Sequence, residues 1–208
     1  LLRGLADDLR LDVWLRGYMM PVEREFVSPE FVQLGTRLAC IESIRSGVTC
    51  FADMYYYEQD AAETIADVGM RAVCGQTVSK YQSPDATSYE HALEAARHFI
   101  EKWKDHPLVV PTVAPHAPYS CTEDIMKAAA DMAIEHDVPL HTHIAETSTE
   151  VEESRKQHDM PVVPYAKKQN LFAGKATAAH CVHIDDGEIH TLLHNNVGVA
   201  HNPSSNLK

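Results

Sequence analysis

The stretch Pro139-Leu140-His141-Thr142-His143-Ile144-Ala145-Glu146 ends an apolar run with two histidines and places a glutamate three residues after the second. In a β-strand, side chains alternate between faces, so His141 and His143 share one face and Glu146 follows just past the strand end. Imidazole nitrogen is a common Zn²⁺ ligand, and a carboxylate beside a water molecule can move its proton. The same spacing also arises by chance as two polar residues near a strand end. The surrounding chain must decide between these alternatives.

Short β-prone runs alternate with helical segments on both sides of this stretch. The periodicity predicts six strands, at 48–53, 70–77, 108–114, 138–144, 175–181 and 197–201. It predicts helices at 29–46, 58–68, 88–106, 122–136, 147–158, 164–169 and 186–194. The irregular segment 79–87 is expected to form a loop over a site.

The clearest helix begins at Ser28-Pro29-Glu30, with a capping hydroxyl, a proline in the first turn and an acid near the positive end of the helix dipole. It continues to Gly47 with apolar residues at helical spacing, namely Phe31, Leu34, Leu38, Ile41 and Ile44. This pattern predicts an amphipathic helix.

Strands that alternate with helices predict right-handed βαβ crossovers and a parallel sheet covered by helices. The fold is then an α/β fold, either an open doubly wound sheet or a (β/α)₈ barrel. No Gly-x-Gly-x-x-Gly sequence follows any predicted strand, so the best marker of a dinucleotide-binding sheet is missing. At 208 residues, with 45% hydrophobic and 23% charged residues, the chain suits one globular domain or part of one.

Charge and hydropathy exclude several classes of partner. The net charge of −12 disfavours nucleic acid, because its binding relies on Lys and Arg to neutralise phosphates. No apolar stretch approaches the ~20 residues that span a bilayer, which disfavours a membrane partner. The five cysteines are widely spaced and suit reduced thiols better than a disulfide framework. Cytoplasm is therefore the expected location.

Polar residues gather at the ends of the predicted strands, and in a barrel the carboxyl-terminal strand ends hold the active site. Four segments there, together with residues 1–9 and Trp14, resemble the amidohydrolase superfamily, and within it the 5-methylthioadenosine/S-adenosylhomocysteine deaminases. The four segments are Pro115-His116-Ala117-Pro118-Tyr119-Ser120-Cys121, His141-Thr142-His143-Ile144-Ala145-Glu146-Thr147, Ala179-His180-Cys181-Val182-His183, and Ala200-His201-Asn202-Pro203-Ser204-Ser205-Asn206-Leu207-Lys208.

The resemblance implies a (β/α)₈ TIM-type barrel that this chain forms only in part. Residues 1–208 would be a single incomplete barrel domain that holds about strands 2–7, with strands 1 and 8 missing. The family binds one metal per site, Zn²⁺ first and Fe²⁺ second, through a His-x-His on strand 1, a histidine on strand 5 and an aspartate on strand 8. Only the strand 5 ligand is in this chain. It is assigned to His143, and His141 is then a neighbour or packing residue.

The resemblance also assigns roles in catalysis and substrate binding. Glu146 would take a proton from a metal-activated water and pass it to the purine ring nitrogen and then to the departing amine. His180 would stabilise the tetrahedral intermediate by hydrogen bonding. His116 would contact the nucleoside, Glu23 the ribose hydroxyls, and Trp14 would enclose the substrate. A solvated acid at Glu23 and a packing aromatic at Trp14 fit the sequence equally well.

The function implied is metal-dependent hydrolytic deamination of 5-methylthioadenosine, S-adenosylhomocysteine or adenosine, with release of ammonia. A carboxylate-bearing substrate is in doubt, because Gln76 ends the predicted third barrel strand and Lys80 is the nearest cation.

The alternatives are an aminohydrolase or chlorohydrolase of purine, pterin or triazine rings, or an inactive partial barrel that serves as a binding module. With one of four ligands, the chain is expected to be inactive by itself. The resemblance also suggests a homo-oligomer acting on a small-molecule nucleoside or heterocyclic amine.

Overall fold

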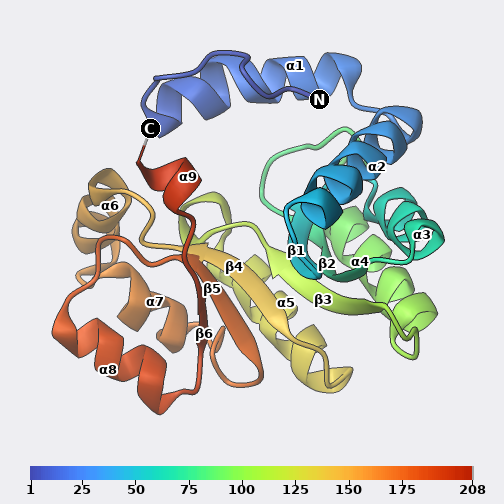
Figure 1. The fold of residues 1–208 in the computed structure, drawn as a ribbon. Coiled ribbons are helices and arrows are strands. Elements are labelled where there is room, and N and C mark those ends of the chain that lie inside the picture. The colour runs from blue at the N-terminus through green and yellow to red at the C-terminus, as the bar shows by residue number, and fades with distance from the viewer. Residues whose placement is uncertain (208) are drawn as a thin grey trace.

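Six parallel strands form one curled sheet in which each strand lies beside its neighbour in sequence. The computed structural model describes residues 1–207, and Figure 1 shows the sheet as part of a TIM-type barrel. The α/β partial-barrel prediction is confirmed, and the number of strands agrees. The strands are β1 (Cys50–Tyr55), β2 (Arg71–Val78), β3 (Val109–Pro115), β4 (Leu140–Ile144), β5 (Ala176–His180) and β6 (Gly198–Ala200).

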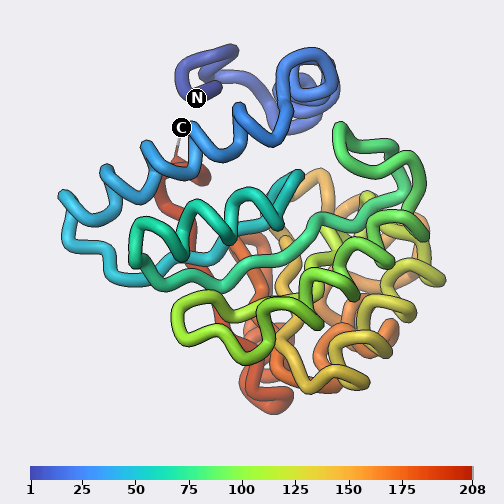
Figure 2. Tube along the Cα trace, turned by 90° about the vertical axis from the view of Figure 1, so that its right-hand side faces the viewer, coloured from blue at the N-terminus to red at the C-terminus, as the bar shows by residue number. Residues whose placement is uncertain are grey.

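Helices cover the outer face of the sheet, and a further helical segment lies across the upper ends of the strands (Figures 1 and 2). The segment across the top is η1 (Val13–Met19), a π-helix, followed by α1 (Met20–Phe26). The remaining helices are α2 (Pro29–Arg45), α3 (Glu58–Val68), α4 (Tyr89–Trp103), η2 (Pro118–Ser120), α5 (Glu123–Glu135), α6 (Ser148–His158), α7 (Val162–Lys168), α8 (Asp186–His194) and α9 (Pro203–Asn206).

Most of the helices predicted from the sequence begin at side-chain caps, whereas α3 and α7 do not. Ser28, Ser88, Thr122 and Thr147 each accept a hydrogen bond from the amide three residues later, which satisfies one of the unpaired amides of the first turn. Gly69 ends α3 with a φ of 80°, a conformation that glycine adopts without strain. These local signals explain why helix positions agree closely with the sequence pattern.

The main core lies between the sheet and helices α4 to α8. Leu140 and Ile144 of β4 point into this core and are almost fully buried. The intervening residues His141 and His143 therefore face the inside of the curled sheet, as the period of two predicts.

Three parts of the chain differ from the sequence pattern. The sequence predicts no helix before residue 28, whereas residues 13–26 form η1 and α1. Pro203–Asn206 forms the short helix α9 where no helix is predicted, and Lys208 lies outside the described residues. The apolar stripe of α2 does not face the core: its Leu34, Leu38, Ile41 and Ile44 are 43–62% exposed. The helix instead buries Val32, Thr36 and Cys40, so a smaller, less apolar face makes its contacts.

No helix in residues 1–207 combines the length and apolar character that crossing a bilayer requires.

Candidate active site

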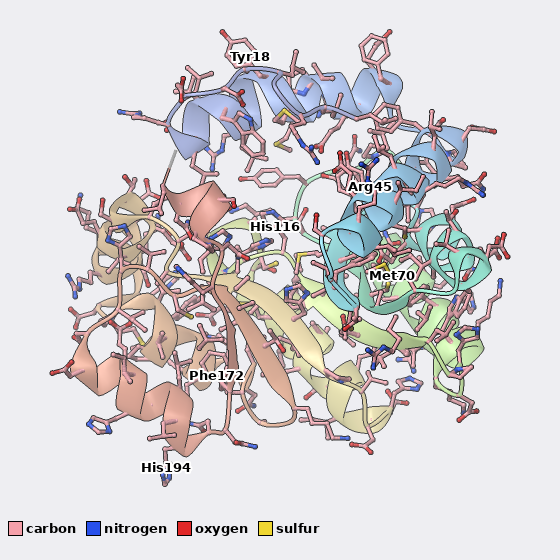
Figure 3. All side chains as sticks on the ribbon, viewed as in Figure 1. Tyr18, Arg45, Met70, His116, Phe172 and His194 are labelled. Atoms are coloured by element: carbon pink, nitrogen blue, oxygen red, sulfur yellow. The ribbon has the colours of Figure 1, made fainter. Side chains whose placement is uncertain are left out.

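A cavity of about 250 Å³ lies at the carboxyl-terminal ends of the strands, beneath the amino-terminal helices. Figure 3 shows His116 at this position, between the sheet and the helices above it. Segments far apart in the sequence meet here, as expected for the active-site end of a barrel. The cavity is lined by Leu11, Trp14, Leu15, Glu23, Met54, Tyr55, Tyr56, Thr77, His116, Tyr119, His143, Glu146, His180 and Ser205.

His143 is oriented by the backbone of the neighbouring strand end. Its Nδ1 donates a hydrogen bond to the carbonyl oxygen of His116 at 2.5 Å. The ring proton therefore lies on Nδ1, and Nε2 carries the lone pair. The backbone amide of His143 donates to the same carbonyl at 3.1 Å, which fixes the strand and the ring together.

Burial, together with the nearby imidazoles of His116, His141 and His180, lowers the pKa of His143 to about 3, and the hydrogen bond to the His116 carbonyl opposes that shift. A neutral imidazole with one nitrogen held by a carbonyl is the state in which histidine binds a metal. His143 therefore fits a metal ligand. Among residues 1–207, no group of three or more His, Cys, Asp or Glu is arranged to hold a metal, so His143 alone would not bind one tightly.

Glu146 and His180 face one another across the site. His180 Nε2 lies 3.6 Å from Glu146 Oε1, and the two side chains are 7% and 13% exposed. On its other side, the His180 ring contacts the amide of Asn206, with Nδ1 3.0 Å from Nδ2 and 3.3 Å from Oδ1. If Nδ2 donates this bond, the ring proton of a neutral His180 lies on Nε2 and points toward Glu146.

His116 is held by Ser120. Its Nδ1 lies 2.8 Å from Ser120 Oγ, and that hydroxyl donates to the carbonyl of Ala117 at 3.1 Å. His116 therefore donates through Nδ1 and presents the lone pair of Nε2. Burial lowers its pKa to about 4, which keeps the ring neutral near pH 7. Tyr119 packs edge-on against this ring, with centroids 5.9 Å apart.

Glu23 is a buried carboxylate and not a solvated acid. It is 8% exposed, and its Oε1 accepts a hydrogen bond from the hydroxyl of Tyr55 at 2.8 Å. Burial raises the pKa of Glu23, and the Tyr55 hydrogen bond opposes that shift. Its carboxylate and the indole of Trp14 both line the cavity, so both reach the site that the sequence suggested for them.

The structure brings together all six of the residues proposed from the sequence, namely Trp14, Glu23, His116, His143, Glu146 and His180. His141 lies beside His143, with ring centroids 6.4 Å apart, and is buried. Three other polar residues near strand ends lie elsewhere. Asp53 packs in the outer layer against Cys74, whereas His183 and His201 are exposed.

Sequence reasoning did not identify Tyr119, Asn206 or Glu150 as part of this site. Tyr119 and Asn206 lie within two of the quoted strand-end segments, so their neighbours gave a signal for them. Glu150 lies on α6, and its carboxylate accepts hydrogen bonds from the amides of Ala145 and Glu146. Its place three residues after Thr147 is the spacing of a helix capping box, which predicts a helix start but not a contact with the Ala145 and Glu146 amides.

The sequence model of the Amidohydrolase family matches residues 1–208. The chain is 43% identical over 208 residues to a 5-methylthioadenosine/S-adenosylhomocysteine deaminase of Thermodesulfovibrio yellowstonii, covering 100% of this chain and 47% of the relative. It is 38% identical over 208 residues to a 5'-deoxyadenosine deaminase of Methanothrix thermoacetophila, covering 100% of this chain and 48% of that protein.

Among solved structures, an adenosine deaminase from Xanthomonas campestris with bound zinc aligns with a TM-score of 0.95. It is 34% identical, and the alignment covers 100% of this chain and 47% of that one. The chain thus spans about half the length of the curated relatives that it matches.

Proposed function

The chain belongs to the amidohydrolase family, and from that premise we propose that it forms part of a metal-dependent hydrolytic deaminase of an adenine nucleoside. The observation that carries the proposal is the pairing of Glu146 with His180, 3.6 Å apart, beside the available Nε2 of His143. Deamination needs a group that moves protons to the departing amine, and Glu146 is a carboxylate in that position.

His143 would hold the metal through Nε2, with the other ligands supplied from outside residues 1–208. The zinc in the Xanthomonas campestris structure supports Zn²⁺, and Fe²⁺ is kept as the second candidate. A divalent metal, when bound, lowers the pKa of a water molecule toward neutrality and makes it a nucleophile. The carbonyl of His116 fixes the ring that presents Nε2.

Glu146 would act as the proton shuttle. Its carboxylate takes a proton from the attacking water and delivers it to the ring nitrogen next to the amino-bearing carbon. It then takes the remaining hydroxyl proton of the tetrahedral intermediate and passes it to the amine, which leaves as ammonia while the carbonyl forms. His180 would donate a hydrogen bond through Nε2 to the attacking oxygen, which stabilises the charge that develops in the tetrahedral intermediate. Asn206 would hold the His180 ring for this task.

The substrate would be held by His116, Glu23 and Trp14. The Nε2 lone pair of His116 accepts a hydrogen bond from the nucleoside, and the second oxygen of Glu23 accepts one from a ribose hydroxyl. Trp14 encloses the ligand from η1, above the strand ends. A cavity of about 250 Å³ is smaller than most drug-sized pockets, which suits a compact ligand.

The lining of the cavity favours a nucleoside with an uncharged 5' substituent. Leu11, Leu15 and Met54 are apolar, and no lysine or arginine is among the described residues that line it. A carboxylate placed there would lose water without gaining a cation. We therefore expect 5-methylthioadenosine to have a kcat/KM at least tenfold above that of S-adenosylhomocysteine, as steady-state ammonia release would measure; equal values would contradict this preference.

The decisive test is ammonia release from 5-methylthioadenosine by the full-length, metal-loaded protein. Glu146→Gln should reduce kcat by about 10²–10⁴-fold, the usual contribution of a general acid–base group. Glu101→Gln, an exposed acid on α4, serves as the matched control and should leave kcat unchanged. Full turnover by the Glu146 variant would eliminate the proton-shuttle role, and absence of turnover by the wild type would eliminate the proposed reaction.

We also propose a cytoplasmic, homo-oligomeric enzyme in which this chain forms one part of a single barrel domain. Support for the location comes from the five thiols, none of which forms a disulfide in the structure. Light scattering measures the molar mass of the full-length protein in solution, and a mass equal to that of one chain would contradict the homo-oligomer.

A further inference from the structure

Glu150, near the start of α6, accepts hydrogen bonds from backbone amides that precede the helix. Thr147 caps this helix, because its Oγ1 accepts from Glu150 N at 3.2 Å. In a capping box, the acid three residues after the cap reaches back to the amide of the cap residue. Here the carboxylate reaches further: Oε2 accepts from Glu146 N at 2.8 Å and Oε1 from Ala145 N at 3.3 Å.

The two amides that Glu150 holds belong to the turn that directs Glu146. Ala145 has a φ of 50°, in the left-handed region that residues with a Cβ seldom adopt. Its carbonyl oxygen accepts from Val182 N at 3.1 Å and from His183 N at 3.0 Å, both beyond the end of β5. Each of the two peptide groups that flank Ala145 is therefore held on both sides: its amide donates to Glu150 of α6, and its carbonyl accepts from the segment after β5.

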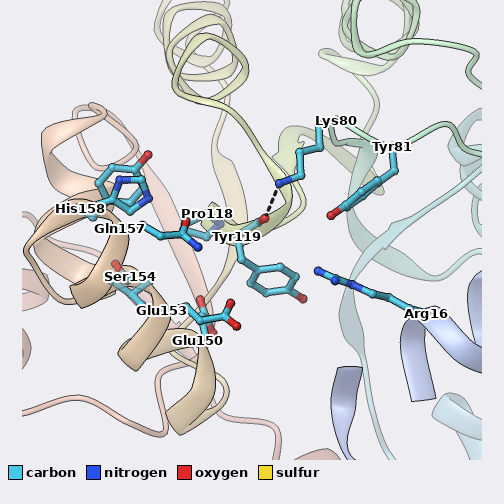
Figure 4. A pocket seen from close by; sticks show the side chains of 12 residues that line it. Arg16, Lys80, Tyr81, Pro118, Tyr119, Glu150, Glu153, Ser154, Gln157 and His158 are labelled. Atoms are coloured by element: carbon cyan, nitrogen blue, oxygen red, sulfur yellow. Dashed lines mark hydrogen bonds between the residues drawn. The ribbon is translucent and has the colours of Figure 1, made fainter. Parts of the chain in front are cut away.

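Burial makes this contact hard to replace. Glu150 is 6% exposed, so little water reaches the amides in its absence, and two unpaired buried amides would favour a different turn. Figure 4 shows the Glu150 side chain beneath Tyr119, where it also borders an outer cavity. Glu150 thus lies behind the catalytic turn, out of reach of a substrate that contacts Glu146.

We propose that Glu150 is a positioning residue for deamination, and that its carboxylate fixes the Ala145–Glu146 turn so that Glu146 faces His180 and the cavity. This role rests on the proposed function, because it acts through Glu146. A purely structural role at the start of α6 is the alternative, and Thr147 already provides that cap.

The test uses the full-length, metal-loaded enzyme with Glu150→Gln. A glutamine keeps one acceptor oxygen but turns its amide donor toward the other N–H group. One of the two hydrogen bonds to Ala145 and Glu146 is therefore lost, with little change in side-chain volume. We expect kcat for 5-methylthioadenosine to fall about tenfold or more, with KM within about twofold and metal content unchanged. Glu152→Gln, an exposed acid on the same helix, is the matched control and should match wild type.

Two further measurements separate positioning from a folding defect. Hydrogen exchange should show that the amides of residues 145 and 146 lose protection in Glu150→Gln, while the rest of α6 stays protected. Ala145→Gly allows the positive φ without strain, so adding it to Glu150→Gln should restore kcat at least about threefold. Loss of a helix cap would not be rescued by glycine at that position.

The outcomes distinguish the two proposals. If Glu146→Gln is inactive but Glu150→Gln has a kcat within twofold of wild type, the positioning role is overturned and the proposed function stands. A fall in kcat without rescue by Ala145→Gly, or with protection at residues 145 and 146 intact, also overturns it. Absence of ammonia release by the wild type removes the proposed function itself, and the positioning role with it.

Discussion

His141 and His143 stand two residues apart on the same face of β4 with different surroundings. His143 has its Nδ1 bonded to the His116 carbonyl, whereas Nδ1 of the buried His141 has no hydrogen-bond partner among the residues described. Metal-binding histidines commonly have their second nitrogen held in this way. The local hydrogen bond therefore supports His143 as the ligand, on grounds independent of the family resemblance.

Replacement of each histidine by asparagine in the full-length protein separates their roles. His143→Asn should lower bound metal at least tenfold after dialysis, because a primary ligand is lost. His141→Asn should retain metal close to the wild-type ratio. Inductively coupled plasma mass spectrometry gives the metal-to-protein ratio, and equal losses in both variants would contradict the assignment.

Glu58, at the start of α3, is fully buried in the outer layer of the fold. Its carboxyl group forms no well-aligned hydrogen bond in the described part of the chain, and only the Cys74 side chain and the Tyr55 backbone lie close enough to favour its charged form weakly. Burial raises its pKa well above the usual value near 4.5, and the adjacent Asp53 raises it further. The folded protein therefore keeps a proton on this acid that the unfolded chain releases above about pH 4.5.

The stability that depends on this proton is present below pH 4.5 and is lost as the pH rises through the raised pKa. Glu58→Gln cannot ionise, so it should unfold at a higher temperature than wild type at pH 8, by roughly 2 °C or more. The difference should shrink toward pH 5. Differential scanning fluorimetry at both pH values measures it, and a variant less stable than wild type at pH 8 would refute the reasoning.

At the level of elements, helix starts combine local caps with contacts between helices. Asp185 and Glu188 form a reciprocal capping box at the start of α8, where each side chain accepts from the other residue's amide. The second oxygen of Glu188 also accepts from Val163 N of α7 at 3.3 Å. One buried acid thus fixes the helix start and its packing against α7.

Glu188→Ala should lower the free energy of unfolding by roughly 1–3 kcal/mol, because two amides of a buried region lose their acceptor. Ile189→Ala, at a half-exposed position in the same turn, should change it by less than about 0.5 kcal/mol. Urea unfolding followed by circular dichroism measures both. Since Glu188 does not line the candidate active-site cavity, ammonia release by the full-length variant should equal that of wild type, and a lower rate would show an unexpected coupling.

For the molecule as a whole, the apolar stripe of α2 is the largest departure from the sequence pattern. Leu34, Leu38, Ile41 and Ile44 remain exposed over residues 1–207, and β1 and β6 each pair with one described neighbour. Exposed apolar stripes and unpaired strand edges promote association. The chain spans about half the length of its relatives. The exposed stripe and the strand edges are therefore stated for residues 1–207 alone.

The 208-residue chain on its own should therefore self-associate in sedimentation velocity at micromolar concentration. Leu34→Glu combined with Ile41→Glu should weaken that association at least tenfold, since charges replace the apolar stripe. Leu193→Glu, which changes an exposed leucine on α8 outside this stripe, is the control and should have no effect. A chain that stays monomeric, or a control that weakens association equally, would contradict this expectation.

The sequence by itself determined the order of the six strands and of the α-helices from α2 to α8, together with the histidines at the strand ends, but it did not predict η1 and α1. Residue periodicity, caps and glycine stops are local, so they act within a few residues of chain. The tertiary structure decided which face of α2 is buried, and that Tyr55 holds Glu23 across 32 residues. It also joined His143 to a carbonyl 27 residues away and His180 to Asn206 26 residues away. Such contacts depend on how the sheet curls and which strand ends meet, and no local pattern records them.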